Sequence, residues 1–486
     1  MGAQAKEYRE VNAEVNASNI SAHIENGDDI YLDNCQIIGE LNASKIKIET
    51  VPNTFDSLFE KELIKEEIIY IGINEKLIAI KSNITIINSN FEDTLNFSFV
   101  YFYNSADFYN TTFNNDAKFG LATFNNRADF DKATFNNDAD FTLTTFNKRA
   151  NFSKVTFNFA KFLGTTFNKD ADFSYATFNN YAIFLNATFN NYAYFYDATF
   201  NEDADVSYAT FNKDADFFNA TFNNYAYFLN AIFNKDADFS YATFNDASFY
   251  NATFNNTDFS YATFNNTDFL NAIFNKDADF YDATFNNFAK FLGTTFNKDA
   301  DFSVPDSSEN IITDGKNCEF FMKCYNNEAL YREADNIYYN YRINAKAGEA
   351  LSFSMFIDIL SWITCGYGVR PSHTLYLGGT LIVLFSFIYA KDPAVRFYTD
   401  RYGVYSFDFY FKGSGITKKK EDFEDQPQKV SFRDALYFSV NTFTTVGNTN
   451  WYPKENFKKW ATLEGLLGWT MLGIFMATLT NVIMRL

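Results

Sequence analysis

Phenylalanine recurs along the middle of this 486-residue chain at a spacing that neither a helix nor a continuous strand uses. From about residue 95 to Phe302 the Phe residues lie alternately five and six residues apart, and between Phe244 and Phe274 every step is five. The unit is close to A-T-F-N-N-x-A-D-F-x-x, so a small residue stands two positions before most Phe. This period is neither 3.6 nor 2. We therefore predict a chain that turns a corner every five or six residues, with Phe and Ala inward and Asn, Asp, Lys and Thr in water.

This pattern resembles that of the pentapeptide-repeat family. The resemblance implies a right-handed quadrilateral β-solenoid, which we place at residues 96–304, with the extra residue of each six-residue step at alternate corners. About nine coils at ~4.8 Å each would make a rod on the order of 45 Å long. Residues 1–95 alternate less regularly. Because a solenoid needs atypical units at its ends, we expect these residues to form its N-terminal cap.

A second informative stretch begins at Ser431 and reads SFRDALYFSVNTFTTVGNTN. It lies between two apolar segments, 371–390 and 461–484, each long enough to span a bilayer. Ser431 followed three residues later by Asp434 is an N-cap signature, which predicts a short helix over 432–443. Such a helix directs the negative end of its dipole and its free carbonyls at the TTVGNTN that follows. Carbonyls and hydroxyls placed there can replace the water shell of a cation.

Span, short helix, TTVG and span together resemble the pore domain of the two-transmembrane, tetrameric potassium-channel family, whose filter reads TVGYGD. The resemblance implies an all-α, two-transmembrane pore domain over residues 371–486, assembled as a homotetramer in a lipid bilayer. The matching residues are Thr445, Val446 and Gly447, and the departing ones are Asn448, Thr449 and Asn450, where the family has Tyr, Gly and Asp. The alternative is a two-span membrane anchor whose loop carries TTVG by chance.

The resemblance also assigns roles to single residues. A monovalent cation is expected at Thr445, Val446 and Gly447. Asn441 is expected to support the filter, and Gly468 or Gly473 is the candidate hinge of the second span. Glu464 is a candidate filter support because it is ionisable and near the outer end of that span, and anchoring the back of the short helix is its alternative role. Close helix packing through small residues is the alternative role for the two glycines. The full set expected to line the ion path is Thr444, Thr445, Val446, Gly447, Asn448, Thr449 and Asn450.

Residues 305–370 connect the two parts. A stripe of apolar residues from Leu330 to Tyr341 predicts a helix, which forms a tetrameric collar or packs on the last coil. Residues 353–364 are amphipathic and predict a helix lying on the membrane. The Cys-Gly-Tyr-Gly at 365–368 is closer in letters to the family filter than TTVG is, but no span precedes it. We interpret it as the turn into the first span.

Composition limits the function. The net charge of −20 argues against nucleic acid as the main partner, and the two His, without a catalytic triad, phosphate loop or metal cluster, argue against an enzyme. No cofactor is expected beyond the permeant K⁺ and Na⁺. The start of the chain has no signal-peptide pattern, so we expect a multi-pass plasma-membrane protein with a cytoplasmic N-terminal domain.

The favoured function is a tetrameric channel for K⁺ and Na⁺, with the solenoid as a regulatory or interaction domain that takes an intracellular ligand or protein. A K⁺-selective channel is the first alternative. The second is a membrane-anchored interaction protein whose acidic solenoid mimics DNA. A helix followed by TTVG between two spans favours the channel, because a membrane anchor does not need it.

Overall fold

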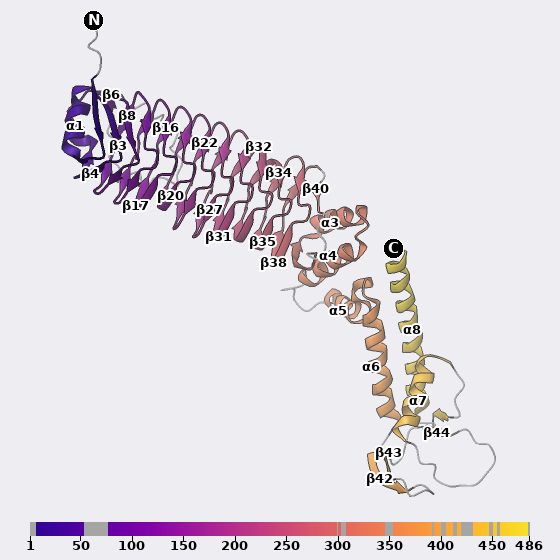
Figure 1. Ribbon diagram of the computed structural model, residues 1–486. Coiled ribbons are helices and arrows are strands. Elements are labelled where there is room, and N and C mark those ends of the chain that lie inside the picture. Colours follow the sequence, from indigo (N-terminus) through magenta and orange to yellow (C-terminus); the bar gives the residue numbers. More distant parts are fainter. Residues whose placement is uncertain are drawn as a thin grey trace. The chain divides into compact units, whose positions relative to one another are not determined.

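The computed structural model describes residues 6–52, 76–298, 300–302, 308–345, 353–390, 393–399, 405–411, 416–418, 431–446, 451–453 and 457–484. The chain divides into two compact units, Met1–Tyr341 and Arg342–Leu486. Figure 1 shows the first as a stack of short strands and the second as a group of helices.

Each coil of the first unit carries four short strands, which make the four faces of a solenoid. In one coil these are β11 (Val100–Phe102), β12 (Ala106–Asp107), β13 (Thr112–Phe113) and β14 (Ala117–Lys118). The first two belong to a sheet of 23 described strands and the last two to a sheet of 18. Each strand pairs in parallel with its counterpart in the next coil, so Phe102 faces Phe124 of β15 (Thr123–Phe124). The predicted β-solenoid is confirmed.

The solenoid begins earlier and is longer than the Phe repeat indicates. β1 (Glu7–Val11) pairs in parallel with β3 (Asp29–Asp33), which pairs with β8 (Ile84–Ile87), which pairs with β12. The stack therefore has about 13 turns, not about nine. The first coils use Ile, Leu and Val inside, which the Phe period does not reveal. Helix α1 (Ala17–Asn26) lies among these first coils, and its buried Ile20 and Ile24 join the same core.

Stacked Phe rings fill the core. Phe200 lies 4.6 Å from Phe222, and Phe222 lies 4.9 Å from Phe244, centroid to centroid, with ring planes within 5° of parallel. Rings from neighbouring faces meet edge to face, as Phe222 and Phe228 do at 77°. The Ala residues two positions earlier are also buried, which confirms the predicted inward pair.

The alternating steps leave a visible mark on strand pairing. Where a coil with a six-residue step faces a coil with a five-residue step, the register shifts, as between Phe135 and Asp138 of β17 (Thr134–Asp140) against β20 (Thr156–Lys161). The extra residue of this step lies between Phe135 and Asp138, and its place at a corner stays a prediction.

Asparagine contributes more than the predicted contact with water. The side-chain amide of Asn168 donates to Asn147 at 2.9 Å, and the same 2.9 Å bond repeats for Asn190 to Asn168, Asn212 to Asn190 and Asn234 to Asn212. This ladder ties successive coils together along one corner. Ladders of this kind form because the same residue recurs at the same place in each coil.

Two helices close the C-terminal end of the solenoid. After β41 (Ile311–Thr313), which pairs with β38 (Thr284–Phe291), come α3 (Gly315–Asn327) and α4 (Tyr331–Asn344). Phe320 of α3 stacks on Phe296 at 4.5 Å, and Ile337 of α4 is buried in the same core. The stripe that begins at Leu330 therefore packs on the last coil, the second of its two predicted roles.

The second unit contains α5 (Phe353–Cys365), the short turn η4 (Gly366–Gly368), α6 (Pro371–Tyr389), α7 (Phe432–Phe443) and α8 (Lys458–Ile483). Of the described helices, α6 and α8 are long and apolar enough to cross a membrane. Gly366, Tyr367 and Gly368 all have positive φ angles, so this Cys-Gly-Tyr-Gly is a tight turn between α5 and α6, as predicted. Between α6 and α8, β42 (Pro393–Thr399) pairs antiparallel with β43 (Tyr405–Phe411), and β44 (Ile416–Lys418) with β45 (Trp451–Pro453).

Candidate ion-conduction site

Helix α7 sits between the two long helices and ends at the TTV of the predicted filter. Its range, Phe432–Phe443, is the one predicted. Ser431 is the N-cap: its hydroxyl accepts a bond from the backbone N–H of Asp434, whose carboxylate accepts from the N–H of Ser431 at 2.9 Å. This capping box explains why so short and aromatic a segment begins a helix there. The acid also complements the positive end of the helix dipole.

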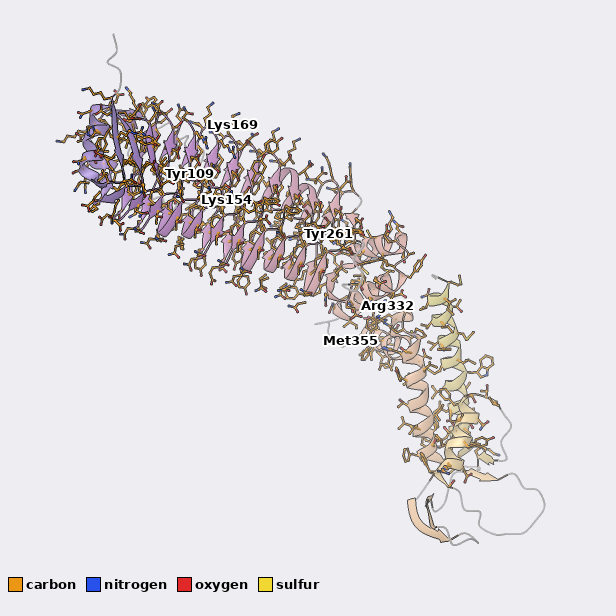
Figure 2. All side chains as sticks on the ribbon, in the orientation of Figure 1. Tyr109, Lys154, Lys169, Tyr261, Arg332 and Met355 are labelled. Carbon is orange, nitrogen blue, oxygen red and sulfur yellow. The ribbon has the colours of Figure 1, made fainter. Side chains whose placement is uncertain are left out.

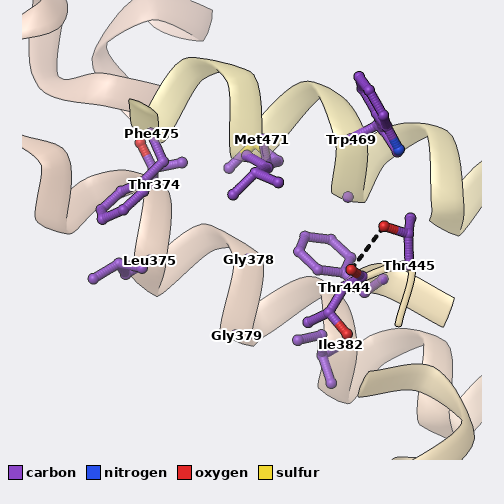
Figure 3. A pocket seen from close by; sticks show the side chains of 13 residues that line it. Thr374, Leu375, Gly378, Gly379, Ile382, Thr444, Thr445, Trp469, Met471 and Phe475 are labelled. Atoms are coloured by element: carbon purple, nitrogen blue, oxygen red, sulfur yellow. Dashed lines mark hydrogen bonds between the residues drawn. The ribbon is translucent and has the colours of Figure 1, made fainter. Parts of the chain in front are cut away.

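The residues after α7 present oxygen atoms close together. The Thr445 hydroxyl donates to the Thr444 carbonyl at 2.7 Å, a bond drawn in Figure 3, and the Thr444 hydroxyl donates to the Val440 carbonyl at 2.7 Å. Thr445 has a φ of 57°, so the chain leaves the helix here. Thr445 and Val446 are exposed, which leaves this end of α7 open to a neighbour or to ions. The other expected filter residues, 447–450, lie outside the described part.

Asn441 makes a local bond instead of reaching the following turn. Its side-chain amide donates to the Tyr437 carbonyl on its own helix at 2.6 Å. Its expected counterpart, Asn450, lies outside the described residues. The filter-support role of Asn441 therefore stays a prediction.

Glu464 holds the back of α7. This α8 carboxylate is fully buried, and it accepts a hydrogen bond at 2.6 Å from the Tyr389 hydroxyl at the end of α6. Its other oxygen accepts from the Ser439 hydroxyl of α7, which also lies 2.8 Å from the Ile382 carbonyl. One buried acid thus joins three helices, and it is stable there because hydroxyl donors compensate for its lost water.

Tyr389 and Ser439 are site residues that sequence reasoning missed. Tyr389 stands 75 residues from Glu464, and both are fully buried. A polar residue inside an apolar segment was a signal for each. The sequence did not show that these two polar groups share one carboxylate.

Glu464→Ala is expected to destabilise the assembled protein by about 1–3 kcal/mol, because the buried Tyr389 hydroxyl loses its acceptor and the Ser439 hydroxyl keeps only the Ile382 carbonyl. Glu464→Gln is the matched control: its amide oxygen accepts from one hydroxyl and its amide group donates to the other, so the loss should be about 1 kcal/mol. Thermal unfolding in detergent measures both. Equal melting of the wild type and Glu464→Ala would show that the three-helix link carries no stability.

Gly468 lets α8 approach the end of α7. A Cβ at this position would collide with the carbonyl oxygen and carbon of Phe443, the last residue of α7. At Gly473 a Cβ would meet nothing within 4 Å. Of the two hinge candidates, Gly468 therefore has the packing role that was the alternative, whereas Gly473 has room for a side chain.

An apolar cavity of about 270 Å³ opens beside this contact. It is bounded by α6, by α8 and by Phe443 with the residues that follow α7; Figure 3 shows Met471 between the two long helices, with Phe475 and Leu375 toward one end and Thr444 and Thr445 toward the other. Trp469 on its rim is 68% exposed. The cavity and the rim are surfaces that a lipid chain or a second subunit can cover.

Two family models match the sequence. Pentapeptide repeats (9 copies) match in overlapping segments from residue 130 to residue 303, and Ion channel matches residues 402–485. No curated protein and no solved structure matches the chain. Neither matched family is a family of enzymes. The chain therefore carries pentapeptide repeats folded as a parallel β-solenoid, followed by an ion-channel domain with two candidate membrane helices.

Proposed function

We propose that four copies of this chain form a channel in the plasma membrane that conducts K⁺ and Na⁺ through residues 444–450. The solenoid lies in the cytoplasm, where it serves as a regulatory or interaction domain. One observation carries the proposal: a capped helix, α7, is held between two apolar helices by Gly468 and Glu464, and its carbonyl end runs into Thr-Thr-Val-Gly. A two-span anchor has no use for this arrangement.

Assembly as a tetramer follows from the geometry of a carbonyl ring. One chain supplies one α7, and a closed ring of carbonyls around an ion needs four. Large apolar side chains on α8, such as Leu466 at 61% exposure and Trp469, need lipid or neighbouring subunits to cover them. We expect a mass of about 220 kDa in mild detergent, four times the 55.9 kDa of one chain. A monodisperse dimer would contradict this assembly.

Selectivity is expected to be weak, so that Na⁺ passes as well as K⁺. The inner ion sites would use the carbonyls of Thr445 and Val446 and the Thr445 hydroxyl. The outer sites of the resembling family rest on Tyr, Gly and Asp, which this chain replaces with Asn448, Thr449 and Asn450. Fewer ordered sites discriminate less between the two ions.

The filter can be tested by restoring the family sequence. The triple change Asn448→Tyr, Thr449→Gly and Asn450→Asp should raise the K⁺ over Na⁺ permeability ratio by at least about fivefold. Reversal potentials measured under bi-ionic conditions give the ratio for both proteins. If the wild-type reversal potential follows the K⁺ gradient alone, the chain is the K⁺-selective alternative.

Opening of the pore is assigned to Gly473. A Cβ at Gly473 would meet no neighbouring atom within 4 Å, so this part of α8 is not pressed against the rest of the chain, whereas Gly468 lies against the Phe443 backbone and a bend there would disturb that contact. In this proposal the solenoid and the helices that follow it carry the stimulus to the inner end of the pore.

A further inference from the structure

One corner of the solenoid displays an aromatic side chain in each of six successive coils. The rings contact one another in order: Tyr196 stacks on Phe218 at 5.3 Å, and Tyr241 stacks on Tyr261 at 4.8 Å. Four of the six are 42–50% exposed. We call this set the aromatic row. Its members are Tyr175, Tyr196, Phe218, Tyr241, Tyr261 and Tyr281.

A column of aspartates runs beside the aromatic row. Each uses its Oδ1 atom to accept the backbone N–H two residues later, as Asp216 does from Phe218 at 3.0 Å and Asp279 from Tyr281 at 2.8 Å. Neighbours in the column face each other across paired strands. Within the described part of the chain, no Lys or Arg forms an ion pair with any of them. The members of this Asp column are Asp216, Asp238, Asp258 and Asp279.

The same corner nearer the N-terminus shows what these groups bind. There the row continues with lysines: Lys132 lies 4.9 Å from the ring centre of Tyr109 and donates to its hydroxyl at 2.7 Å, and Lys154 lies 5.9 Å from the ring of Tyr175. Figure 2 labels Tyr109, Lys154 and Tyr261, which follow one another along the solenoid. The N-terminal part of this corner therefore supplies its own cations.

Two aspartates of that N-terminal part form ion pairs as well. Asp129 forms an ion pair with Arg127, and Asp172 with Arg149 at 2.8 Å. From Tyr175 onward the rings and acids repeat, but the row itself has no Lys or Arg.

The local potential at the unpaired part is negative. Burial, followed by the charge of Asp238, raises the pKa of Asp216. On the row itself, the nearby Asp197 raises the pKa of Tyr196. A cation brought to this corner would relieve that repulsion and meet ring faces and carboxylates together.

We propose that the aromatic row and the Asp column form a docking surface for an extended, basic polypeptide segment, whose Arg or Lys side chains take the places that Lys132, Lys154, Arg127 and Arg149 occupy in the earlier coils. The net charge of −20 and the paired half of the same corner specify a cationic partner. A nucleic acid would be repelled, and a second copy of the solenoid would bring its own acids. This surface deepens the interaction role of the solenoid and does not depend on ion conduction.

The spacing of the coils suggests a probe. In a polyproline II segment every third side chain recurs after ~9.3 Å, close to the ~9.6 Å spanned by two coils. A fluorescent peptide of four Arg-Pro-Pro units should therefore bind the full-length protein in detergent at ~0.15 M salt, where distant charges are screened. The same peptide with Gln in place of Arg should not bind. Fluorescence anisotropy gives the Kd.

The contribution of the aromatic row is tested first with variants that leave the net charge of the protein unchanged. The triple change Tyr196→Ser, Tyr241→Ser and Tyr261→Ser should weaken binding of the Arg peptide by at least about tenfold. The control triple removes three exposed tyrosines away from the row and should change Kd by less than about twofold. It consists of Tyr181→Ser, Tyr208→Ser and Tyr225→Ser. Tyr241→Lys with Tyr261→Lys copies the N-terminal half and should also block the peptide.

A second pair of variants tests the acids. The triple change Asp216→Asn, Asp238→Asn and Asp258→Asn keeps an oxygen to cap each backbone N–H but removes three charges, and should weaken binding by at least about tenfold. The opposite corner offers the matched change of three capping aspartates, Asp140→Asn, Asp205→Asn and Asp268→Asn, which should have at most about a twofold effect.

Three binding results would overturn the proposal: no binding of the Arg peptide by the wild type, equal binding by the row triple and its control triple, or an equal loss of binding from the two aspartate triples. A fourth is a wild-type assembly with twice the mass of the tetramer, if the row triple returns that mass to the mass of one tetramer. The last would make a second copy the occupant of the row.

Discussion

Phe222→Asp should unfold the coils on either side of it while the helical unit still assembles. Phe222 is buried, with rings from the coils before and after it at 4.6 and 4.9 Å. An unpaired carboxylate there has no hydrogen-bond donor to compensate for lost water, which costs several kcal/mol, roughly five or more. Because each coil contacts only its neighbours, unfolding should extend from the coil of Phe222 into the adjacent coils, and coils farther along the solenoid should stay folded.

The matched control for this change is Asn223→Asp. It places the same charge one residue later, on an exposed side chain of the same strand, where it removes one exposed hydrogen bond to Asn201, and should cost about 1 kcal/mol. Far-ultraviolet circular dichroism of the melt, with limited proteolysis, measures the loss, and the mass in detergent reports on assembly. If Phe222→Asp melts with Asn223→Asp, the ring stack does not hold the coils together.

Gly468→Ala should be the most damaging single-methyl change in the channel domain. The added carbon would overlap the Phe443 backbone, which cannot rotate away as a side chain can. Either α8 moves outward or the end of α7 moves, together with Thr444 and Thr445. Overpacking of this kind costs about 1–3 kcal/mol or more, and here the displaced atoms lead directly into the proposed ion path. We expect a less stable tetramer and at least about tenfold less K⁺ flux per tetramer.

Gly465→Ala is the control one turn earlier on α8. A Cβ there would lie 3.7 Å from the Thr442 carbonyl oxygen, an ordinary contact, so stability and flux should stay near those of the wild type. Because alanine favours helices more than glycine does, a slight stabilisation is the expected direction. If Gly468→Ala behaves like Gly465→Ala, α8 does not press on the end of α7.

The solenoid could be predicted because its core residues recur at a regular spacing in the sequence. Phe and Ala recur on the inward side of the strands in each coil, and burial follows directly from that spacing. The first coils could not be counted in this way, since β1, β3 and β8 use mixed aliphatic residues and alternate like any strand. The aromatic row was equally hidden: Tyr196 and Tyr241 occupy different places in the repeat and meet only once the coils are stacked in space.

In the channel domain the sequence predicted local structure well and contacts between distant residues poorly. Ser431 and Asp434 lie three residues apart, so the start of α7 is determined by residues that are close in sequence. The link from Glu464 to Tyr389 joins residues far apart in sequence, and no periodicity reports it. Nothing in the sequence was a reason to assign different roles to Gly468 and Gly473, and only the contact of Gly468 with the Phe443 backbone distinguishes the two.

Ion flux through the purified full-length protein in liposomes tests the central claim most directly. With the tetramer verified by mass, K⁺ and Na⁺ gradients should each collapse, Cl⁻ should be retained, and replacement of Thr445, Val446 and Gly447 together by alanine should abolish the cation flux without changing the mass. A verified tetramer whose liposomes leak K⁺ and Na⁺ no faster than empty ones would contradict the proposed channel.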